Sequence, residues 1–247
     1  MTEQKSRLRL IDTLRGMAVV SMVLFHFAWD LKYILRLKID LYSDMGIIWQ
    51  QSICWTFILI SGFCFHFSKN SLKNGLITFL CGGIVSAVTI FFMPDSAIYF
   101  GILTFLGSAM LILSPLKPIL SKIPSSVGTI ISFFCFLVCF NINRGHLFFG
   151  EIFLPKSLYS NMFTAFLGFP NSRFSSSDYF PLLPWIFLFL TGFFLSGFLK
   201  NKSIPKLLNF GIPPFELIGK KALIIYMLHQ PVLYLLTLLL GVLINDN

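Results

Sequence analysis

The chain has 247 residues and a formal net charge of +9, with 56% hydrophobic and only 12% charged residues. A soluble domain carries roughly 25% charged residues, and a globule of this length could not bury so much apolar surface. A disordered chain is also excluded, because such chains are poor in apolar residues. The composition therefore predicts an all-α, polytopic membrane helix bundle, in which lipid covers the apolar faces.

Basic residues outnumber acidic ones, 19 to 10, which in a soluble protein would suggest nucleic-acid binding. Here they stand between apolar segments, so membrane topology explains them and we expect no nucleic-acid partner. The cysteines lie inside apolar runs without a CxxC pair, which favours packing residues over disulfides or metal ligands. They are Cys54, Cys64, Cys81, Cys135 and Cys139.

Windows of about 20 residues predict about seven membrane spans, and we treat residues 1–247 as one transmembrane domain. The pairs Ser61-Gly62 and Thr191-Gly192 predict close helix contacts in the second and sixth spans. Asp178 stands just before the sixth span, where its carboxylate is expected to cap that helix. The seven spans are 10–30, 46–68, 75–93, 98–114, 125–141, 181–199 and 222–244.

The distribution of basic residues predicts the orientation, because cytoplasmic loops carry an excess of Lys and Arg. With the N-terminus inside, 13 of the 19 basic residues lie on the inner side and 6 on the outer side. We therefore expect a multi-pass protein of the cell membrane, in bacteria the cytoplasmic membrane, with its C-terminus outside. The inner set is Lys5, Arg7, Arg9, Arg15, Lys69, Lys73, Lys117, Lys122, Lys200, Lys202, Lys206, Lys220 and Lys221; the outer set is Lys32, Arg36, Lys38, Arg144, Lys156 and Arg173.

The first span carries the densest set of ionisable residues, which are costly in a membrane and usually face the bundle interior. Arg15 and His26 are separated by eleven positions, so they share one helix face about 16 Å apart, with Asp12 and Asp30 close to the same stripe. A carboxylate at Asp30 can hold the imidazole of His26 in one tautomer, which suits proton transfer. The alternative is an Asp12–Arg15 ion pair and a structural histidine.

The seventh span contains His229 and Gln230 directly before Pro231. Proline has no N–H, so the carbonyl of Met227 loses its helical partner and the helix is expected to kink. A kink beside these two side chains would form a polar notch inside the bundle. The alternative is that both side chains repair the broken hydrogen-bond ladder.

Four motifs follow one another from the first span to the last: RLIDTLRGMA at 9–18, FPLLPW at 180–185 with Gly192, IGKKAL at 218–223 and YMLHQP at 226–231. Together they resemble the heparan-alpha-glucosaminide N-acetyltransferase catalytic-domain family, as a small bacterial member. The opening motif, with ten residues between Arg15 and His26, is also similar to the acyltransferase 3 family of membrane O-acyltransferases.

The resemblance implies an acyl-CoA-dependent N- or O-acyltransferase. The acyl group, by expectation acetyl, would pass from cytoplasmic acyl-CoA to an amine or hydroxyl of an extracytoplasmic, sugar-containing acceptor. By motif position His26 matches the first-span histidine of the acyltransferase 3 pattern. It would either remove the acceptor's proton or form an acyl-imidazole.

Residue by residue, the catalytic candidates are His26, Asp30 and His229. Basic residues of the inner face would bind the CoA phosphates, and His229, Gln230 and Tyr226 would donate hydrogen bonds to the thioester oxygen. The residues expected to contact the co-substrate are Arg15, Asp12, Lys69, Lys73, Lys220, Gln230 and Tyr226.

A small-molecule transporter or a non-catalytic membrane protein is the alternative, because membrane His and Asp with a Pro-kinked helix also occur in proton-coupled carriers. The chain lacks two matching halves with interrupted helices, which counts against a carrier. No metal-binding motif is present, so we expect acyl-CoA as co-substrate and no metal. The expected partners are acyl-CoA, a small-molecule or glycan acceptor and the lipid bilayer; a homodimer is left open.

Overall fold

The computed structural model describes residues 8–199 and 206–245. Lys5, Arg7, Lys200 and Lys202, which enter the topology count, lie outside them. The described residues form the helices α1 (Arg9–Tyr33), α2 (Asp44–Phe67), α3 (Ser71–Phe92), α4 (Ile102–Leu120), α5 (Ser125–Cys139), α6 (Met162–Leu167), α7 (Leu182–Gly197), α8 (Pro213–Lys220) and α9 (Ala222–Asn245).

The remaining regular structure is short and lies mostly between α5 and α7. Two strands of two residues, β1 (His146–Leu147) and β2 (Ile152–Phe153), pair antiparallel. The fold is thus almost wholly helical, as the composition predicts. Single 3-10 turns complete it: η1 (Pro94–Ser96), η2 (Ile142–Arg144), η3 (Phe148–Gly150), η4 (Lys156–Leu158) and η5 (Lys206–Asn209).

Six helices in the described residues are long and apolar enough to cross a membrane, which confirms the multi-pass class. They are α1 to α4, α9, and α5 with the turn that continues it to Arg144. The predicted sixth span, 181–199, corresponds to α7, an apolar helix of 16 residues. At 1.5 Å per residue α7 is about 24 Å long, shorter than a hydrocarbon core of about 30 Å. The count of seven spans and the orientation of the termini stay predictions.

The start of α4 differs from the prediction because a distant carboxylate caps it. Asp178 Oδ2 accepts a hydrogen bond from the backbone N–H of Ile102 at 3.1 Å, and Phe180 N–H donates to the carbonyl of Phe100 at 2.9 Å. The expectation that Asp178 caps its own helix is wrong: the N-cap of α7 is Pro181, without a side-chain hydrogen bond. At its other end α4 continues past the predicted limit at 114, through Pro115, to Leu120.

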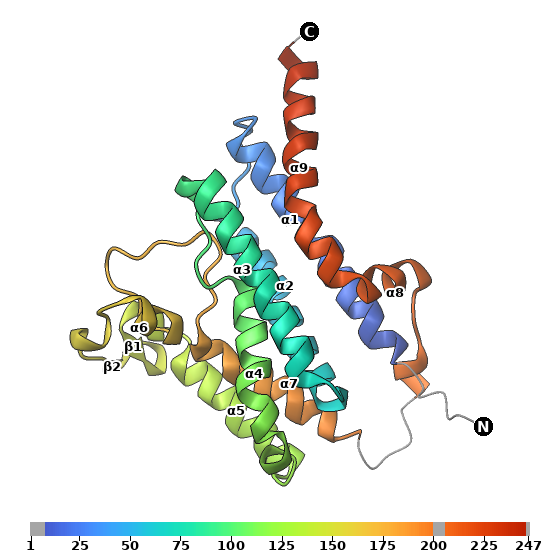
Figure 1. Ribbon diagram of the computed structural model, residues 1–247, viewed down its shortest axis with the longest axis vertical. Helices are drawn as coiled ribbons and strands as arrows, with labels where there is room; N and C mark the ends of the chain where they lie inside the picture. Colours follow the sequence, from blue (N-terminus) through green and yellow to red (C-terminus); the bar gives the residue numbers. More distant parts are fainter. Residues whose placement is uncertain (1–7, 200–205, 246–247) are drawn as a thin grey trace. The chain divides into compact units, whose positions relative to one another are not determined.

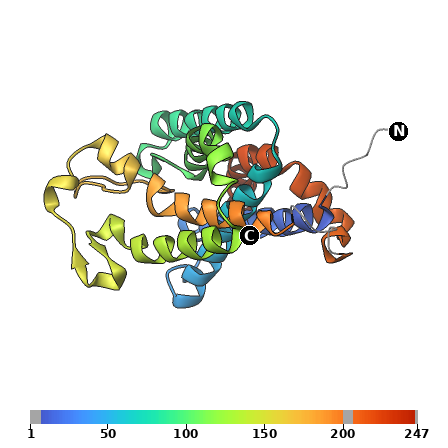
Figure 2. The same ribbon diagram turned by 90° about the horizontal axis from the view of Figure 1, so that it is seen from below.

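The chain forms two compact units. The first takes the described residues up to Phe57 and those from 206 onward; the second begins at Ile58. In the first unit α1 packs against α8 and α9, and in the second α3 packs against α4 and α5 against α7 (Figure 1 and Figure 2). The assignment of 1–247 to a single domain stays a prediction.

Glycines permit the closest helix contacts in each unit. A Cβ at Gly16 of α1 would overlap the carbonyl of Phe215, so α8 lies directly on α1. In the second unit, a Cβ at Gly62 would overlap the carbonyl of Phe189, and one at Gly192 the carbonyl of Leu59. The predicted close contacts at the Ser61-Gly62 and Thr191-Gly192 pairs are therefore confirmed.

Candidate functional site

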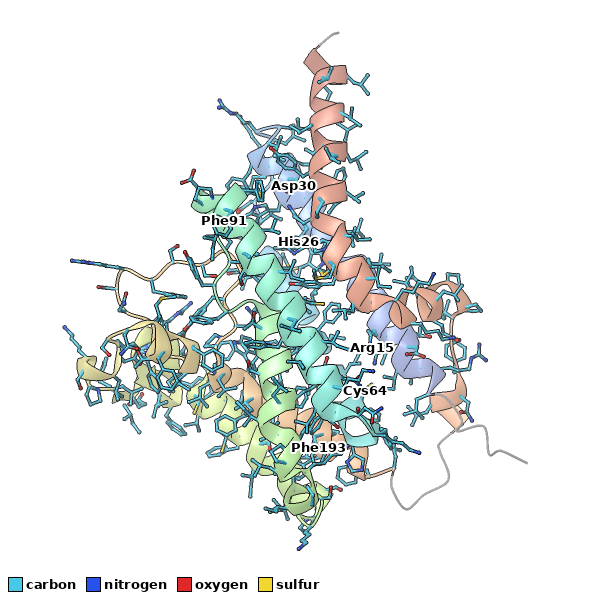
Figure 3. The ribbon with its side chains drawn as sticks, in the orientation of Figure 1. Arg15, His26, Asp30, Cys64, Phe91 and Phe193 are labelled. Atoms are coloured by element: carbon cyan, nitrogen blue, oxygen red, sulfur yellow. The ribbon has the colours of Figure 1, made fainter. Side chains whose placement is uncertain are left out.

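Two histidines meet between α1 and α9 in the first unit. The ring centroids of His26 and His229 lie 4.8 Å apart, with an interplanar angle of 58°. Figure 3 shows Arg15, His26 and Asp30 in succession along α1. The structure therefore brings together the histidines of the first and last predicted spans, which are separated by about 200 residues of chain.

Asp30 binds across the helix pair instead of along its own helix. Gln230 Nε2 donates a hydrogen bond to Asp30 Oδ1 at 2.9 Å, and Asp30 is only 3% exposed. The sequence predicted that this carboxylate would orient His26, one turn earlier. In the structure it holds the amide of Gln230, so it joins α1 to α9.

A backbone carbonyl sets the tautomer of His229. Its Nδ1 lies 2.6 Å from the carbonyl oxygen of Tyr226, which can only accept, so Nδ1 carries the hydrogen. In the neutral ring Nε2 then bears a lone pair. A neutral His229 therefore has no N–H left for a thioester oxygen, the role expected from the sequence, and acts as a hydrogen-bond acceptor. Tyr226 contributes its carbonyl and a ring 5.4 Å from that of His229.

Three buried polar atoms of this cluster have no hydrogen-bond partner among the described residues: Asp30 Oδ2, His229 Nε2 and Gln230 Oε1. Most buried polar atoms in proteins are paired, because an unpaired one costs about 1–3 kcal/mol. Carboxylate and amide oxygens are acceptors, as is the free nitrogen of His229. The cluster can thus receive N–H or O–H groups. No group of three His, Cys, Asp or Glu side chains in the described residues could hold a metal ion.

An apolar cluster lies beside these polar groups. Met22 and Phe25 of α1 pack with Leu41 and Ile53, and all four are buried. Trp49 of α2 packs on this cluster and donates from its indole nitrogen to Ser21 Oγ at 2.8 Å. Apolar walls exclude water, which strengthens electrostatic interactions at the polar groups.

Charged groups gather at the other end of α1. Arg15 donates to Asp12 Oδ1 at 3.0 Å, so the ion pair that the sequence left as an alternative is formed. Glu216 of α8 binds Arg9 at 2.8 Å and Lys220 at 3.7 Å. The hydrogen bond from Arg9, with the neighbouring positive charges, lowers the pKa of Glu216 below its ordinary value. Glu216 was not among the site residues predicted from the sequence, although it is an acidic residue in a strongly basic predicted inner segment.

Lys69 and Lys73 belong to the second unit and are not part of the α1–α9 cluster. Both line a surface cleft of about 620 Å³, together with Lys117. Lys117 was not among the predicted site residues. Its position in the inner set, at the end of the fourth span, is the signal that could have identified it.

The glycines of two motifs now have a physical explanation. Gly16 and Gly219 both lie where α1 and α8 touch, since a Cβ at Gly219 would overlap the carbonyl of Asp12. The first and third motifs are thus one contact surface, and the fourth motif supplies Tyr226, His229 and Gln230.

Comparison with protein families matches residues 7–231 to the family described as heparan-alpha-glucosaminide N-acetyltransferase, catalytic. Neither the search of curated proteins nor that of solved structures finds a match. The match covers all four motifs and both histidines; the similarity to the acyltransferase 3 family stays a prediction. The chain belongs to the heparan-alpha-glucosaminide N-acetyltransferase catalytic family, a family of membrane acetyltransferases.

Proposed function

We propose that the protein transfers an acetyl group from cytoplasmic acetyl-CoA to an amine or hydroxyl of a sugar-containing acceptor on the opposite side of the membrane. Family membership supports the reaction class. The observation that carries the proposal for this chain is the contact between His26 of α1 and His229 of α9, whose ring centroids lie 4.8 Å apart. A structural histidine does not require a second one at its face.

In this mechanism His26 removes a proton from the acceptor's amine or hydroxyl. The freed lone pair attacks the thioester carbonyl carbon, a C–N or C–O bond forms, and the C–S bond breaks. The proton held by His26 then passes to the departing thiolate, so CoA leaves as the free thiol. His229 Nε2 accepts a hydrogen bond from the amine or hydroxyl that will receive the acetyl group, and so orients that group.

Asp30 and Gln230 support this site in a second way. Their hydrogen bond joins α1 to α9 and leaves one oxygen of each side chain without a partner. We assign these two oxygens to the hydroxyl or amine hydrogens of the acceptor. For Asp30, this proposed role replaces the one expected from the sequence, which was to hold His26 in one tautomer.

The charged end of α1 is assigned to the polar part of acetyl-CoA. Arg15 and His26 are eleven positions apart, about 16 Å along the helix, which is close to the reach of a pantetheine arm. Arg15 and Lys220 would contact phosphate, with Asp12 fixing the guanidinium through the observed ion pair. In this arrangement Arg15 contributes to binding and His26 to chemistry.

The direct test uses the purified protein in sealed vesicles with isotope-labelled acetyl-CoA outside and membrane or glycan extracts inside. Label should appear in the enclosed acceptor with the parent protein. His26→Ala should lower turnover per folded molecule by at least about 100-fold, the lower range for general acid–base catalysis. His146→Ala, in the loop after α5, is the matched histidine control and should remain near parental. Near-parental turnover in His26→Ala would exclude His26 as the base.

Acetyl-CoA binding separates this function from transport. We expect the proposed acetyltransferase to bind acetyl-CoA before the acceptor arrives, whereas a small-molecule carrier need not bind it at all. Absence of measurable binding to the parent protein at millimolar acetyl-CoA would contradict the proposed reaction.

A further inference from the structure

The hairpin that follows α5 exposes large apolar side chains outside the helices that can span a membrane. It consists of β1, the turn η3 and β2, and so covers residues 146–153 in the second unit. Four of its side chains are largely exposed, although this segment is not part of a spanning helix. We call these four the hairpin tip: Phe148 (44% exposed), Phe149 (68%), Ile152 (54%) and Phe153 (80%).

The backbone of the turn has an unusual conformation. Phe148 and Phe149 have φ angles of 49° and 58°, in the left-handed region that bulky residues rarely adopt. Such a conformation persists only where other interactions stabilise it. The N–H of Glu151 donates to the Phe148 carbonyl at 3.2 Å, but the described residues cover little of the Phe149 ring. A contact outside the chain is therefore expected to stabilise the turn.

The apolar side chains of the hairpin point to both of its faces. β1 and β2 pair antiparallel, with His146 opposite Phe153 and Leu147 opposite Ile152. Because successive residues of a strand point to opposite faces, Ile152 and Phe153 lie on different faces. A flat protein surface would cover one face of the hairpin, whereas lipid can surround both. Exposure on both faces therefore favours a lipid surface over a protein partner.

The hairpin is continuous with a helix that is long and apolar enough to cross a membrane. That helix is α5 with the turn that continues it to Arg144. Both β1 and η3 pack against α5, and Figure 1 shows β1, β2 and α6 grouped at one end of it. His146 follows Arg144 by two residues, which is at most about 7 Å of extended chain. The hairpin therefore lies close to the end of this helix, where the membrane surface is expected.

Charged residues limit how deeply the hairpin can enter lipid. Glu151 is exposed between Phe149 and Ile152, and a carboxylate is costly in the hydrocarbon region. Arg144 and Lys156 are also exposed and flank the hairpin on either side, where their charges can meet lipid phosphates. Apolar rings between charged residues are typical of segments that lie at the lipid–water interface.

We infer that the hairpin tip inserts into the lipid–water interface of the membrane. There the rings of Phe149 and Phe153 gain the apolar surroundings that the rest of the chain does not provide. This gain offsets the backbone strain at Phe148 and Phe149. The inference concerns membrane contact alone and does not depend on the proposed reaction.

The test measures tryptophan quenching by brominated lipid, with the full chain in phosphatidylcholine nanodiscs. The bromines lie either near the head-group end of the acyl chains or near their methyl end, so that depth can be distinguished. Phe149→Trp and Phe153→Trp are the test variants, because each replaces one exposed aromatic ring by another. Quenching is measured as the difference from the parent, which contains four tryptophans, and the unfolding temperature checks that each variant is folded.

Two further variants calibrate the measurement. Phe134→Trp changes an exposed residue near the middle of the apolar segment 125–144 and should be quenched most by the bromines near the methyl end. Ser175→Trp changes an exposed residue of the polar run before α7. It should be quenched by acrylamide added to the water and by neither lipid.

Insertion predicts that both test variants lose emission in brominated lipid, and lose more when the bromines lie near the head groups. If acrylamide quenches them as strongly as Ser175→Trp and lipid does not, the hairpin lies in water and the inference is wrong. Quenching by neither acrylamide nor lipid would mean that protein covers the tip, such as a second copy of the chain, and also overturns it. Stronger quenching near the methyl ends would contradict the interfacial depth. If one substitution disturbs the fold, the other position decides.

Discussion

The helix pairs α1–α9 and α5–α7 both pack closely, but with different kinds of side chain at the contact. α5 and α7 contain no His, Asp, Glu, Lys or Arg. They pack through aromatic rings and glycine: Phe136 is fully buried with its ring centroid 5.6 Å from that of Trp185, and Gly128 lies under the ring of Phe194.

The α1–α9 pair instead carries His26, Asp30, His229 and Gln230 at its contact. Because α5–α7 shows that this chain can join apolar helices without ionisable groups, packing alone does not explain them. Such groups are costly in a membrane, so we expect those of the α1–α9 pair to have a role beyond packing. The comparison predicts that substitutions in α5–α7 affect stability and those in α1–α9 affect turnover.

The largest effect is expected from Phe136→Ala in α5. Loss of a fully buried ring should lower the free energy of unfolding by about 3–5 kcal/mol, while turnover per folded molecule stays parental. Denaturant unfolding in detergent measures the first quantity and acetyl transfer the second. Phe134→Ala, on the same helix but 57% exposed, is the control and should cost much less. A large loss of turnover in folded Phe136→Ala would break the distinction between the two pairs.

His229→Asn tests whether the histidine of α9 acts chemically. An asparagine amide can keep the hydrogen bond to the Tyr226 carbonyl but has no counterpart to Nε2. We expect an unchanged unfolding temperature and turnover lowered by about 100-fold, as for loss of a positioned proton acceptor. If instead stability falls and turnover per folded molecule is parental, His229 only repairs the helix before Pro231.

Arg15→Gln should have an intermediate effect on binding. Acetyl-CoA affinity is expected to fall about tenfold with a smaller change in maximal turnover, because a charge-assisted phosphate contact is worth about 1.5 kcal/mol or more. Removing Arg15 also removes the ion pair that it forms with buried Asp12. The double variant with Asp12→Asn corrects for this: it should regain stability but not affinity. If either variant binds acetyl-CoA as tightly as the parent protein, Arg15 serves only to form the ion pair with Asp12.

The smallest effect concerns Glu216 and pH. Its pKa is lowered in the folded protein, mainly by the hydrogen bond from Arg9, so the ionised carboxylate stabilises the fold above its ordinary pKa of 4.5. That contribution is lost as the pH falls through the lowered pKa. Glu216→Gln should therefore unfold at a lower temperature than the parent at pH 7, and the difference should shrink below about pH 4.5. A difference independent of pH would show that the pair with Arg9 does not contribute.

The sequence by itself determined the class of the protein and most of its helices. An apolar composition with few charges can fold only where lipid replaces a protein interior, and the 20-residue windows located six helices of the required length. The motifs identified the family over residues 7–231. His26 and His229 could be selected as site candidates from a single sequence, because polar residues within apolar spans are costly in lipid and therefore rare.

Only the tertiary structure decided which of these groups meet. Asp178 caps α4 and not its own helix, and Asp30 binds Gln230 and not His26, because both partners come from segments distant in the chain. Helical periodicity describes one helix face and cannot predict contacts of long sequence separation. The same holds for the tautomer of His229, which the Tyr226 carbonyl sets, and for Lys117, whose charge is held at the cleft by carbonyls of residues about 50 positions earlier.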